Sequence, residues 1–335
     1  MTDRDIPLST LLVHLEDLVR NGLALWDLPR DVTPRLINVS ENTTWLIENT
    51  RGFRAVLRVH REGYHSKRAI ACELAWIEAL RGADVVPTAK MFTGRNGKVI
   101  QQAGTPGLPS ARYLVLFEHL PGAAPDQTSD MTAGFSTVGA MAARCHTHVL
   151  GWQKPRPFER LVWDEEAVFG SAPTWGNWRD APGVDEPARQ VLEDVERVVC
   201  KRLDAYGKTP DRFNLIHADM RLANLLQDAE GTRLIDFDDC GTGWFMYDFA
   251  AAISFIEDDP AVPALRRAWL EGYRSVRRLD PHDEAEIDTF IMLRRMALLA
   301  WIGSHIEAPE PRTLAPHFAR NTVRLGRDWL LRAGA

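Results

Sequence analysis

The stretch LIHADMRLANLLQDAEGTRLIDFDDCG, residues 215–241, decides how the rest of this sequence is interpreted. Its short apolar runs are interrupted by residues that can bind a cation or move a proton: His217, Asp219, Asn224, Asp236, Asp238 and Asp239. Burying a charge is costly unless the charge is paired or bound to a metal. The stretch therefore indicates either solvated loops or a site in which a cation lies between the carboxylates.

A polar turn separates the two apolar runs and predicts a β-hairpin of residues 225–227 with 232–235. Such a hairpin carries Asn224 and Asp236 to the same end of its ladder. Amide and carboxylate oxygens suit Mg²⁺, which takes one or two carboxylates together with phosphate oxygens. Asp219, held slightly apart, is placed to accept a proton from an incoming hydroxyl group.

The composition is that of a globular cytoplasmic protein. The 335 residues are 45% hydrophobic and 26% charged, with a net charge of −6, which suits one large or two ordinary domains. We expect no nucleic-acid partner, because no basic stripe is present. We also expect no membrane contact, because no run approaches the ~20 apolar residues of a membrane span and acidic residues interrupt the first thirty positions. The four cysteines are far apart and form no metal-binding spacing.

The first third of the chain predicts a small antiparallel sheet. Runs rich in Ile, Val and aromatic residues are separated by turn residues, and two segments show helical periodicity. The predicted elements are hairpins over 34–60 and 89–102, a buried strand over 111–122, and helices over 9–22 and 66–82. We expect a domain boundary at the turn after Glu118, with an N-terminal domain of residues 1–119 and a C-terminal domain of residues 120–335.

The remainder of the chain is predicted to be mostly helical. The predicted helices cover 131–149, 185–206, 261–276, 283–303 and 315–332. The stretch 215–241 is the β-rich exception. Residues 151–180 are rich in Pro, Gly and Trp and show no regular period, which is typical of a functional loop in a compact domain. Asp248 precedes the apolar run FAAAISFI and is expected to cap a further helix.

The spacing of the polar residues in 215–241 resembles the catalytic set of kinases. The kinase pattern H-R-D-x-x-x-x-N followed by D-F-G is matched here by H-A-D-M-R-L-A-N and D-F-D. Ala218 stands in place of arginine and Asp238 in place of glycine, which differs from regulated protein kinases. The blocks LIHADMRLANLL and LIDFDDCGTGWFMYDFAAA are similar to those of the aminoglycoside phosphotransferase and choline kinase superfamily, with its homoserine-kinase-like and stress-response members.

This resemblance implies an α+β, protein-kinase-like bilobal fold, with a small antiparallel β-sheet and one main helix in the N-lobe and a larger, mostly helical C-lobe. It also implies ATP- and Mg²⁺-dependent transfer of a phosphoryl group to a hydroxyl group of a small molecule. In that scheme Asn224 and Asp236 hold the metal, with Asp238 as a further contact. Asp219 accepts or orients the proton, and His217 braces the loop.

The resemblance places ATP on the N-terminal sheet. Residues 36–47 resemble the phosphate-covering hairpin of kinases, although they lack its G-x-G-x-x-G sequence. Backbone N–H groups in the turn of this hairpin are expected to cradle phosphate oxygens. The implied nucleotide-binding residues are Ser40, Asn42 and Thr43 at the turn, Arg58 on the following strand, and Phe117, Glu118 and Leu120 at the adenine.

An ion pair is predicted between Arg58 and Glu73. Glu73 lies on the apolar stripe of its helix with Ile70, Ile77 and Leu80, and a carboxylate that points inward calls for a cation. Arg58 occupies the position of the kinase lysine, and its fork can contact a carboxylate and a phosphate together. The arginine also leaves open the alternative of a catalytically weak nucleotide-binding protein.

The acceptor is left open among amino-acid-like, amino-alcohol and aminoglycoside-type molecules. Residues 280–335 contain eight Asp or Glu and seven Lys or Arg, which does not favour a polycationic aminoglycoside. A Ser/Thr protein kinase of the stress-response type is a further alternative, although the chain lacks an activation segment running from D-F-G to A-P-E. The candidate acceptor-site residues are Trp175, Trp178, Arg294, Trp301 and His305.

Overall fold

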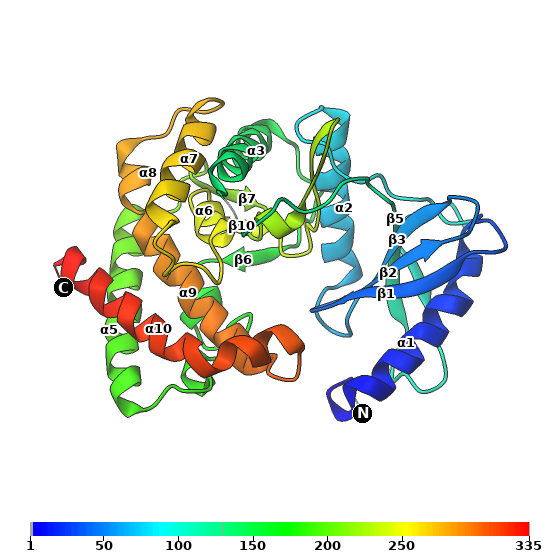
Figure 1. The fold of residues 1–335 in the computed structure, drawn as a ribbon, viewed down its shortest axis with the longest axis horizontal. Coiled ribbons are helices and arrows are strands. Elements are labelled where there is room, and N and C mark those ends of the chain that lie inside the picture. Colours follow the sequence, from blue (N-terminus) through cyan, green and yellow to red (C-terminus); the bar gives the residue numbers. More distant parts are fainter. Residues whose placement is uncertain (1–2, 129, 335) are drawn as a thin grey trace. The chain divides into compact units, whose positions relative to one another are not determined.

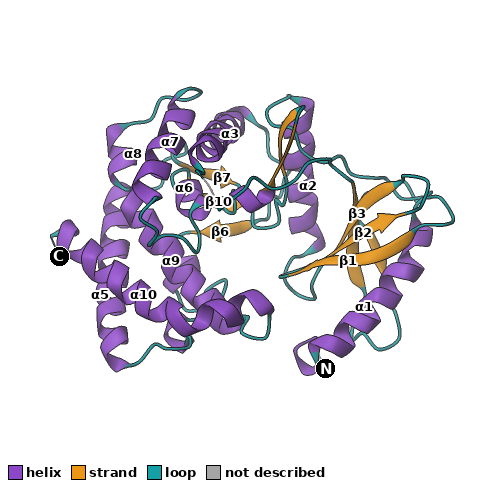
Figure 2. Ribbon diagram, viewed as in Figure 1, coloured by secondary structure: helices purple, strands orange, loops and turns teal. Residues whose placement is uncertain are grey.

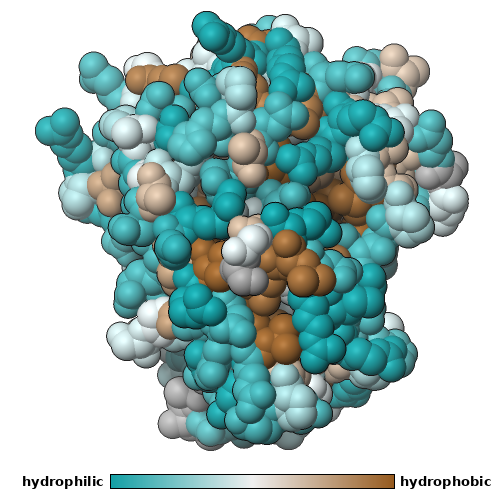
Figure 3. Space-filling view, turned by 90° about the vertical axis from the view of Figure 1, so that its left-hand side faces the viewer, coloured by the Kyte–Doolittle hydropathy of each residue, from teal (hydrophilic) through white to brown (hydrophobic). Residues whose placement is uncertain are grey.

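The computed structural model describes residues 3–128 and 130–334, which form two compact units (Figures 1 and 2). The N-terminal unit consists of Met1–Ala79, Thr88–Pro121 and Lys154–Glu159. The C-terminal unit consists of Leu80–Pro87, Gly122–Gln153 and Arg160–Ala335. The chain therefore passes between the units several times. One face of the molecule is mainly hydrophilic, and apolar side chains show in small areas of it (Figure 3).

The N-terminal unit is built on an antiparallel sheet of five strands. In spatial order these are β1 (Thr33–Val39), β2 (Thr43–Glu48), β3 (Arg54–Val59), β5 (Arg112–Glu118) and β4 (Gln101–Ala103). Helix α1 (Leu8–Gly22) lies along the sheet (Figure 1). Its buried residues Leu15, Leu18 and Val19 join a core with Trp45 and Leu57, because they recur at helical spacing on one side of α1.

The hairpin predicted over 89–102 is wrong. The N–H of Phe92 donates to Leu116, and Gln101 pairs with Leu114, so both segments line the free edge of β5 and do not pair with each other as strands. An open strand edge presents unpaired N–H and C=O groups, which explains why two short segments cover it. The other main helix of this part of the chain, α2 (Lys67–Gly82), lies close to its predicted bounds.

The C-terminal unit is mostly helical (Figure 2). Helices α3 (Thr132–Gly151) and α7 (Val262–Arg274) pack at very close range. A β-carbon on Gly139 would lie 2.0 Å from the carbonyl oxygen of Trp269, and one on Gly272 would lie 1.9 Å from that of Ser136. Only glycine at these two positions allows the two helix backbones to approach each other in this way.

Helix α9 (Ile287–Ser304) runs through the middle of this unit and is buried on nearly every side. A helix without a polar face is typical of the interior of a large domain.

The helix predicted over 283–303 is divided in two at Glu286, because the short α8 (Pro281–Ala285) precedes α9. The remaining long helices are α5 (Glu186–Tyr206) and α10 (Pro309–Ala333), and α10 begins earlier than predicted, with proline in its first turn.

Two small sheets complete the C-terminal unit. Strand β10 (Gly241–Trp244) lies between β6 (Leu161–Trp163), to which it is parallel, and β7 (Phe213–Ile216), to which it is antiparallel. Strands β8 (Leu225–Asp228) and β9 (Gly231–Leu234) form the predicted hairpin. The segment 151–180 is not wholly irregular, because it contains β6 and the short helix α4 (Glu165–Phe169), which is capped by Asp164.

Candidate active site

The loop that carries Asp219 is held at both ends by one pair of strands. Ile216, at the end of β7, pairs with Gly241, at the start of β10. Residues 217–240 therefore form a long loop whose two ends are held together by the antiparallel pair of β7 and β10. The polar residues of this loop are positioned by further contacts within the C-terminal unit.

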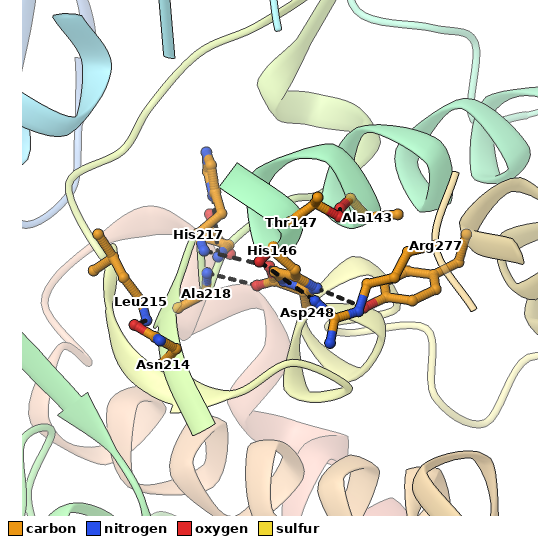
Figure 4. Close-up of polar contacts among 11 residues, drawn as sticks. Ala143, His146, Thr147, Asn214, Leu215, His217, Ala218, Asp248 and Arg277 are labelled. Atoms are coloured by element: carbon orange, nitrogen blue, oxygen red, sulfur yellow. Dashed lines mark hydrogen bonds and ion pairs between the residues drawn. The ribbon is translucent and has the colours of Figure 1, made fainter. Parts of the chain in front are cut away.

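Asp248 anchors the backbone of this loop. It is fully buried, and its Oδ1 accepts from the N–H of Ala218 at 2.7 Å, while Oδ2 accepts from the N–H of His217 at 3.3 Å (Figure 4). Ala218 has a φ of 64°, a conformation that a non-glycine residue adopts only when its surroundings impose it. The cap predicted for Asp248 is wrong, because Met246 is the N-cap residue of α6 (Tyr247–Ala252) and the Asp248 carboxylate bonds the loop.

His146 of α3 completes the support of Asp248. Its Nε2 lies 2.9 Å from Asp248 Oδ2 (Figure 4). Its Nδ1 lies 3.1 Å from the Tyr273 hydroxyl, and its ring stacks on Phe245. Burial lowers the pKa of His146 despite the opposing effect of Asp248. Burial also raises the pKa of Tyr273, so the neutral hydroxyl donates to Nδ1 and the imidazole N–H at Nε2 donates to the carboxylate.

His217 braces the loop, as predicted. Its Nδ1 accepts from the N–H of Asp219 at 3.3 Å, and its Nε2 lies 3.2 Å from the carbonyl oxygen of Ile235. The ring also lies against Phe237, with 4.6 Å between the ring centroids. One side chain thereby joins the segment of Asp219 to the segment of Asp236.

Asp219 is engaged on both of its carboxylate oxygens. Oδ1 accepts from Arg294 Nη2 at 3.0 Å and lies 3.2 Å from Arg221 Nε. Oδ2 accepts from Asn224 Nδ2 at 2.8 Å. Two guanidinium groups thus lie beside one carboxylate oxygen, and the pKa of Arg221 is raised mainly by Asp219. Asp219 is therefore suited to accept a hydrogen bond from a substrate.

The hairpin brings Asn224 and Asp236 to the same end of its ladder, as predicted. Leu225 pairs with Leu234, and the N–H of Ile235 donates to the carbonyl oxygen of Asn224 at 3.0 Å. Asn224 Nδ2 donates to the backbone oxygen and to Oδ2 of Asp219, both at 2.8 Å, so its amide oxygen is left for another partner. Asp236 is exposed and has a φ of 62°.

The segment after Asp236 is fixed through its backbone. Arg160 donates to the carbonyl oxygens of Asp238 and Cys240, the latter at 2.7 Å, and Trp163 Nε1 donates to that of Asp239 at 2.8 Å. The Asp238 side chain is buried, whereas Asp239 is half-buried. Within residues 3–128 and 130–334, no group of three or more His, Cys, Asp or Glu side chains is arranged to hold a metal. A cation at this site would thus also need an amide oxygen or ligand oxygens from a substrate.

The predicted ion pair between Arg58 and Glu73 is present in the N-terminal unit. Arg58 Nη1 donates to Glu73 Oε1 at 2.6 Å, and both side chains are buried. The guanidinium also lies over the ring of Phe117, 5.2 Å from its centroid. This arrangement provides a fixed buried cation on β3, at the position expected to meet phosphates.

The other predicted nucleotide-binding residues are partly used by internal contacts. Asn42 Oδ1 accepts from the N–H of Arg61 at 3.0 Å, and the Thr43 hydroxyl accepts from Trp45 Nε1 at 3.0 Å. The N–H of Glu118 donates to Lys90 at 2.8 Å. Ser40 is exposed, and Leu120 is half-buried. Their roles toward a nucleotide stay predictions.

Four of the five candidate acceptor residues form one connected group. The ring centroids of Trp175 and Trp301 are 6.5 Å apart, Trp301 stacks on His305, and the Arg294 guanidinium lies 5.0 Å from the Trp175 ring centroid. Trp178 makes a separate internal contact, because its Nε1 donates to Glu196 of α5 at 2.7 Å. Contact of any of these residues with an acceptor stays a prediction.

Sequence reasoning missed several residues of this site. Arg221 lies two positions after Asp219, so its position in the motif was the available signal. His146 and the bracing role of Asp248 had no local signal, since these two residues are 102 positions apart.

No helix within the described part of the chain is long and apolar enough to cross a membrane.

Comparison with known proteins identifies a family and solved structures to which this chain is similar. Residues 34–282 match the model of a family described as the phosphotransferase enzyme family. The structure of the microcompartment-associated aminopropanol kinase has a TM-score of 0.87 and 39% sequence identity, with 94% of this chain and 98% of that chain covered. This match confirms the kinase-like fold predicted from the sequence.

Two amicoumacin kinases are more distant relatives. The enzyme from Bacillus subtilis (strain 168) is 22% identical over 297 residues, which covers 86% of this chain and 84% of that protein. The structure of amicoumacin kinase hAmiN in complex with AMP-PNP, Ca²⁺ and Ami has a TM-score of 0.74 and 20% identity, with coverage of 91% and 92%. At this identity the second likeness concerns the fold.

Proposed function

The chain belongs to the phosphotransferase enzyme family, and on this premise we propose that it transfers the γ-phosphoryl group of ATP to the hydroxyl group of a small amino alcohol. As a member of this family the protein is a kinase with an alcohol group as acceptor. ATP as the donor and an amino alcohol as the acceptor are the parts that we propose.

The similarity to the aminopropanol kinase carries this proposal. The 39% identity extends over nearly the full length of both chains, so it is not confined to the motif around Asp219. The balanced charge of residues 280–335 also agrees with an acceptor that carries a single amino group, in contrast to a polycation. An amino alcohol combines the required hydroxyl group with such an amino group.

Phosphoryl transfer of this kind depends on positioning and on charge neutralisation. The acceptor oxygen forms a bond to the γ-phosphorus, and the bond from that phosphorus to the β–γ bridging oxygen breaks, which releases ADP. Asp219 orients the acceptor hydroxyl by accepting its hydrogen bond and takes up the proton as the new bond forms. Arg58, held by Glu73, contacts phosphate oxygens of the nucleotide.

The residues at the hairpin end fit a divalent cation. The Asn224 amide nitrogen is turned to Asp219, which leaves its oxygen as a ligand, and Asp236 is an exposed residue at the same end of the hairpin. We infer that Asn224 and Asp236 hold Mg²⁺, with Asp238 as a further contact. When bound, the cation supplies positive charge that neutralises the phosphate oxygens.

The proposal is tested by measuring ADP release with Mg·ATP and a series of matched acceptors. We expect turnover with 1-amino-2-propanol or 2-aminoethanol, and none with 2-propanol or 2-aminopropane, which lack the amino group or the hydroxyl group. Aminoglycosides, amicoumacin and a protein acceptor complete the series. Turnover confined to one of these last three would replace the amino-alcohol assignment with that acceptor class. ADP release with no acceptor would measure background hydrolysis only.

A further inference from the structure

Helix α9 carries two consecutive buried arginines, Arg294 and Arg295, whose surroundings differ. Their side chains are 2% and 1% exposed. Arg295 pairs with the buried carboxylate of Glu257 and lies over the ring of Phe318, 3.5 Å from its centroid. Arg294 pairs with Asp219. Arg295 thus makes only interior contacts, whereas Arg294 contacts Asp219, the residue proposed to orient the acceptor.

The Arg294 guanidinium is held rigidly by polar contacts and by rings. Nε donates to Ser254 Oγ at 3.1 Å, and Nη2 donates to Asp219 Oδ1 at 3.0 Å. Its central carbon lies 5.0 Å from the ring centroid of Trp175 and 5.8 Å from that of Tyr247. A planar group with two directed hydrogen bonds and rings beside it cannot rotate freely. Arg294 therefore presents Nη2 to Asp219 in one orientation.

The same guanidinium is an expensive group to bury for stability alone. Burial opposes its charge, but Tyr247, Asp219 and Asp239 outweigh burial and raise the pKa of Arg294, so it stays charged. A buried ion pair is often no more stabilising than apolar packing of the same volume. A buried cation paired with a candidate catalytic carboxylate is thus better explained by function.

Arg294 and Arg221 together determine which oxygen of Asp219 remains for a substrate. Arg294 donates a hydrogen bond to Oδ1, and Arg221 forms an ion pair with the same oxygen without a hydrogen bond, so both positive charges lie beside Oδ1. Oδ2 accepts from Asn224 and keeps one lone pair. Arg221 is the less restrained of the two arginines, because its side chain is 26% exposed. The fixed contact that turns the carboxylate is therefore the one from Arg294.

We propose that Arg294 is a positioning residue of the phosphoryl transfer, which locks the Asp219 carboxylate so that Oδ2 faces the acceptor hydroxyl. This inference rests on the proposed function. Arg294 itself touches neither the nucleotide nor the reacting atoms in this scheme. Its effect is geometric, since a misplacement of about 1 Å at a reacting group can cost on the order of 100-fold in rate.

The test compares Arg294→Met with Arg295→Met, a neighbour of the same type and burial on the same helix. Steady-state kinetics with Mg·ATP and 1-amino-2-propanol, together with thermal unfolding, are measured for both variants. We expect Arg294→Met to lower kcat roughly 10- to 100-fold while the KM for ATP changes less than about twofold. Arg295→Met should lower the melting temperature at least as much, because it leaves Glu257 buried and unpaired, while kcat well below that temperature stays within about twofold.

Two milder variants keep the inference testable if Arg294→Met does not fold. Arg294→Lys retains the charge but not the fork, and we expect it to recover part of the lost kcat. Ser254→Ala removes only the bond that orients Nε, and we expect kcat to fall a few-fold with little change in the melting temperature.

The outcomes separate this inference from the proposed function. Equal kcat losses in Arg294→Met and Arg295→Met, or full activity of Arg294→Met, would overturn the positioning role while leaving the proposed function intact. Wild-type protein that transfers phosphate to another hydroxyl acceptor would overturn the amino-alcohol assignment, and the same variants would then be measured with that acceptor. A wild type that phosphorylates no hydroxyl acceptor would overturn both.

Discussion

Asp248 Oδ1 accepts a hydrogen bond from the backbone N–H of Ala218 at 2.7 Å, across thirty positions of sequence. The bond holds Ala218 at a positive φ immediately before Asp219. A buried side chain on α6 thereby sets the backbone of the loop that carries Asp219. The geometry of Asp219 depends on this contact as well as on the partners of its own carboxylate.

Asp248→Asn should damage both stability and turnover. An amide offers one acceptor oxygen in place of two and turns its N–H₂ group toward a backbone donor, so a buried group loses its partner. We expect a loss of about 1–3 kcal/mol in the free energy of unfolding and a lower kcat. Urea unfolding and ADP release measure the two effects. Asp185→Asn is the control, since asparagine caps α5 as well as aspartate does, and a comparable loss there would contradict the assignment.

Asp219→Asn should lower turnover by roughly 10²- to 10⁴-fold and leave ATP binding near normal. The structure adds a stability effect, because the buried Arg294 loses its carboxylate partner. We expect a cost of about 1.5–3 kcal/mol, the range for a hydrogen bond to a charged group. Adding Arg294→Met should restore part of that stability without restoring activity, because neither charge is then left alone. Full turnover of Asp219→Asn would remove Asp219 from the mechanism.

The proposed metal site predicts different effects for residues at the two ends of the β8–β9 hairpin. Asp236→Ala should abolish Mg²⁺-dependent nucleotide binding, and Asn224→Ala should raise the Mg²⁺ concentration needed for half-maximal activity. Asp228→Ala, at the turn end of the same hairpin, should leave both quantities unchanged. Isothermal calorimetry with Mg·ATP measures the binding. Wild-type affinity in Asp236→Ala would show that the site is elsewhere.

The pair Arg58 and Glu73 predicts strong coupling in a double-mutant cycle. Each single alanine substitution should weaken ATP binding, and the double substitution should add little, because either change already breaks the pair. Arg58→Ala should also cost about 3–5 kcal/mol of stability, since it leaves the fully buried Glu73 without its cation. Arg58→Lys should retain only part of the activity. Additive losses in ATP affinity would show that the two residues act independently.

The buried His146 predicts a loss of stability in mild acid. Burial lowers the pKa of His146 below the ordinary value of 6.5, so the unfolded chain binds a proton that the folded chain does not. The free energy of unfolding should therefore fall as the pH drops below about 6.5. His146 faces Asp248, Tyr273 and Arg277 in the fold. In His146→Gln the slope of stability against pH should be shallower, and urea unfolding at pH 7.5 and 5.5 measures it. An unchanged slope would exclude His146 as its source.

Much of the candidate active site was predictable because its residues lie close together in the sequence. Asn224 and Asp236 flank a hairpin whose turn and apolar runs are contiguous, so the ladder alone brings them together. The partnership of Arg58 with Glu73 was predictable for a similar reason, since a carboxylate on an apolar helical stripe requires a cation. The hairpin over 89–102 was mispredicted because the turn pattern does not reveal that β5 has a free edge for both segments.

The sequence by itself determined the candidate catalytic set, the hairpin and the kinase-like fold, because residue spacing and hydrophobic period operate over a few tens of residues. Only the tertiary structure decided which distant side chains hold that set. Arg294 is 75 positions from Asp219, and His146 is 102 positions from Asp248. These contacts arise from how whole helices pack, and the close approach of α3 and α7 at Gly139 and Gly272 is one such packing. A charged residue at a buried position can be recognised from the sequence as one that needs a partner, but the packing of the helices determines which residue is that partner.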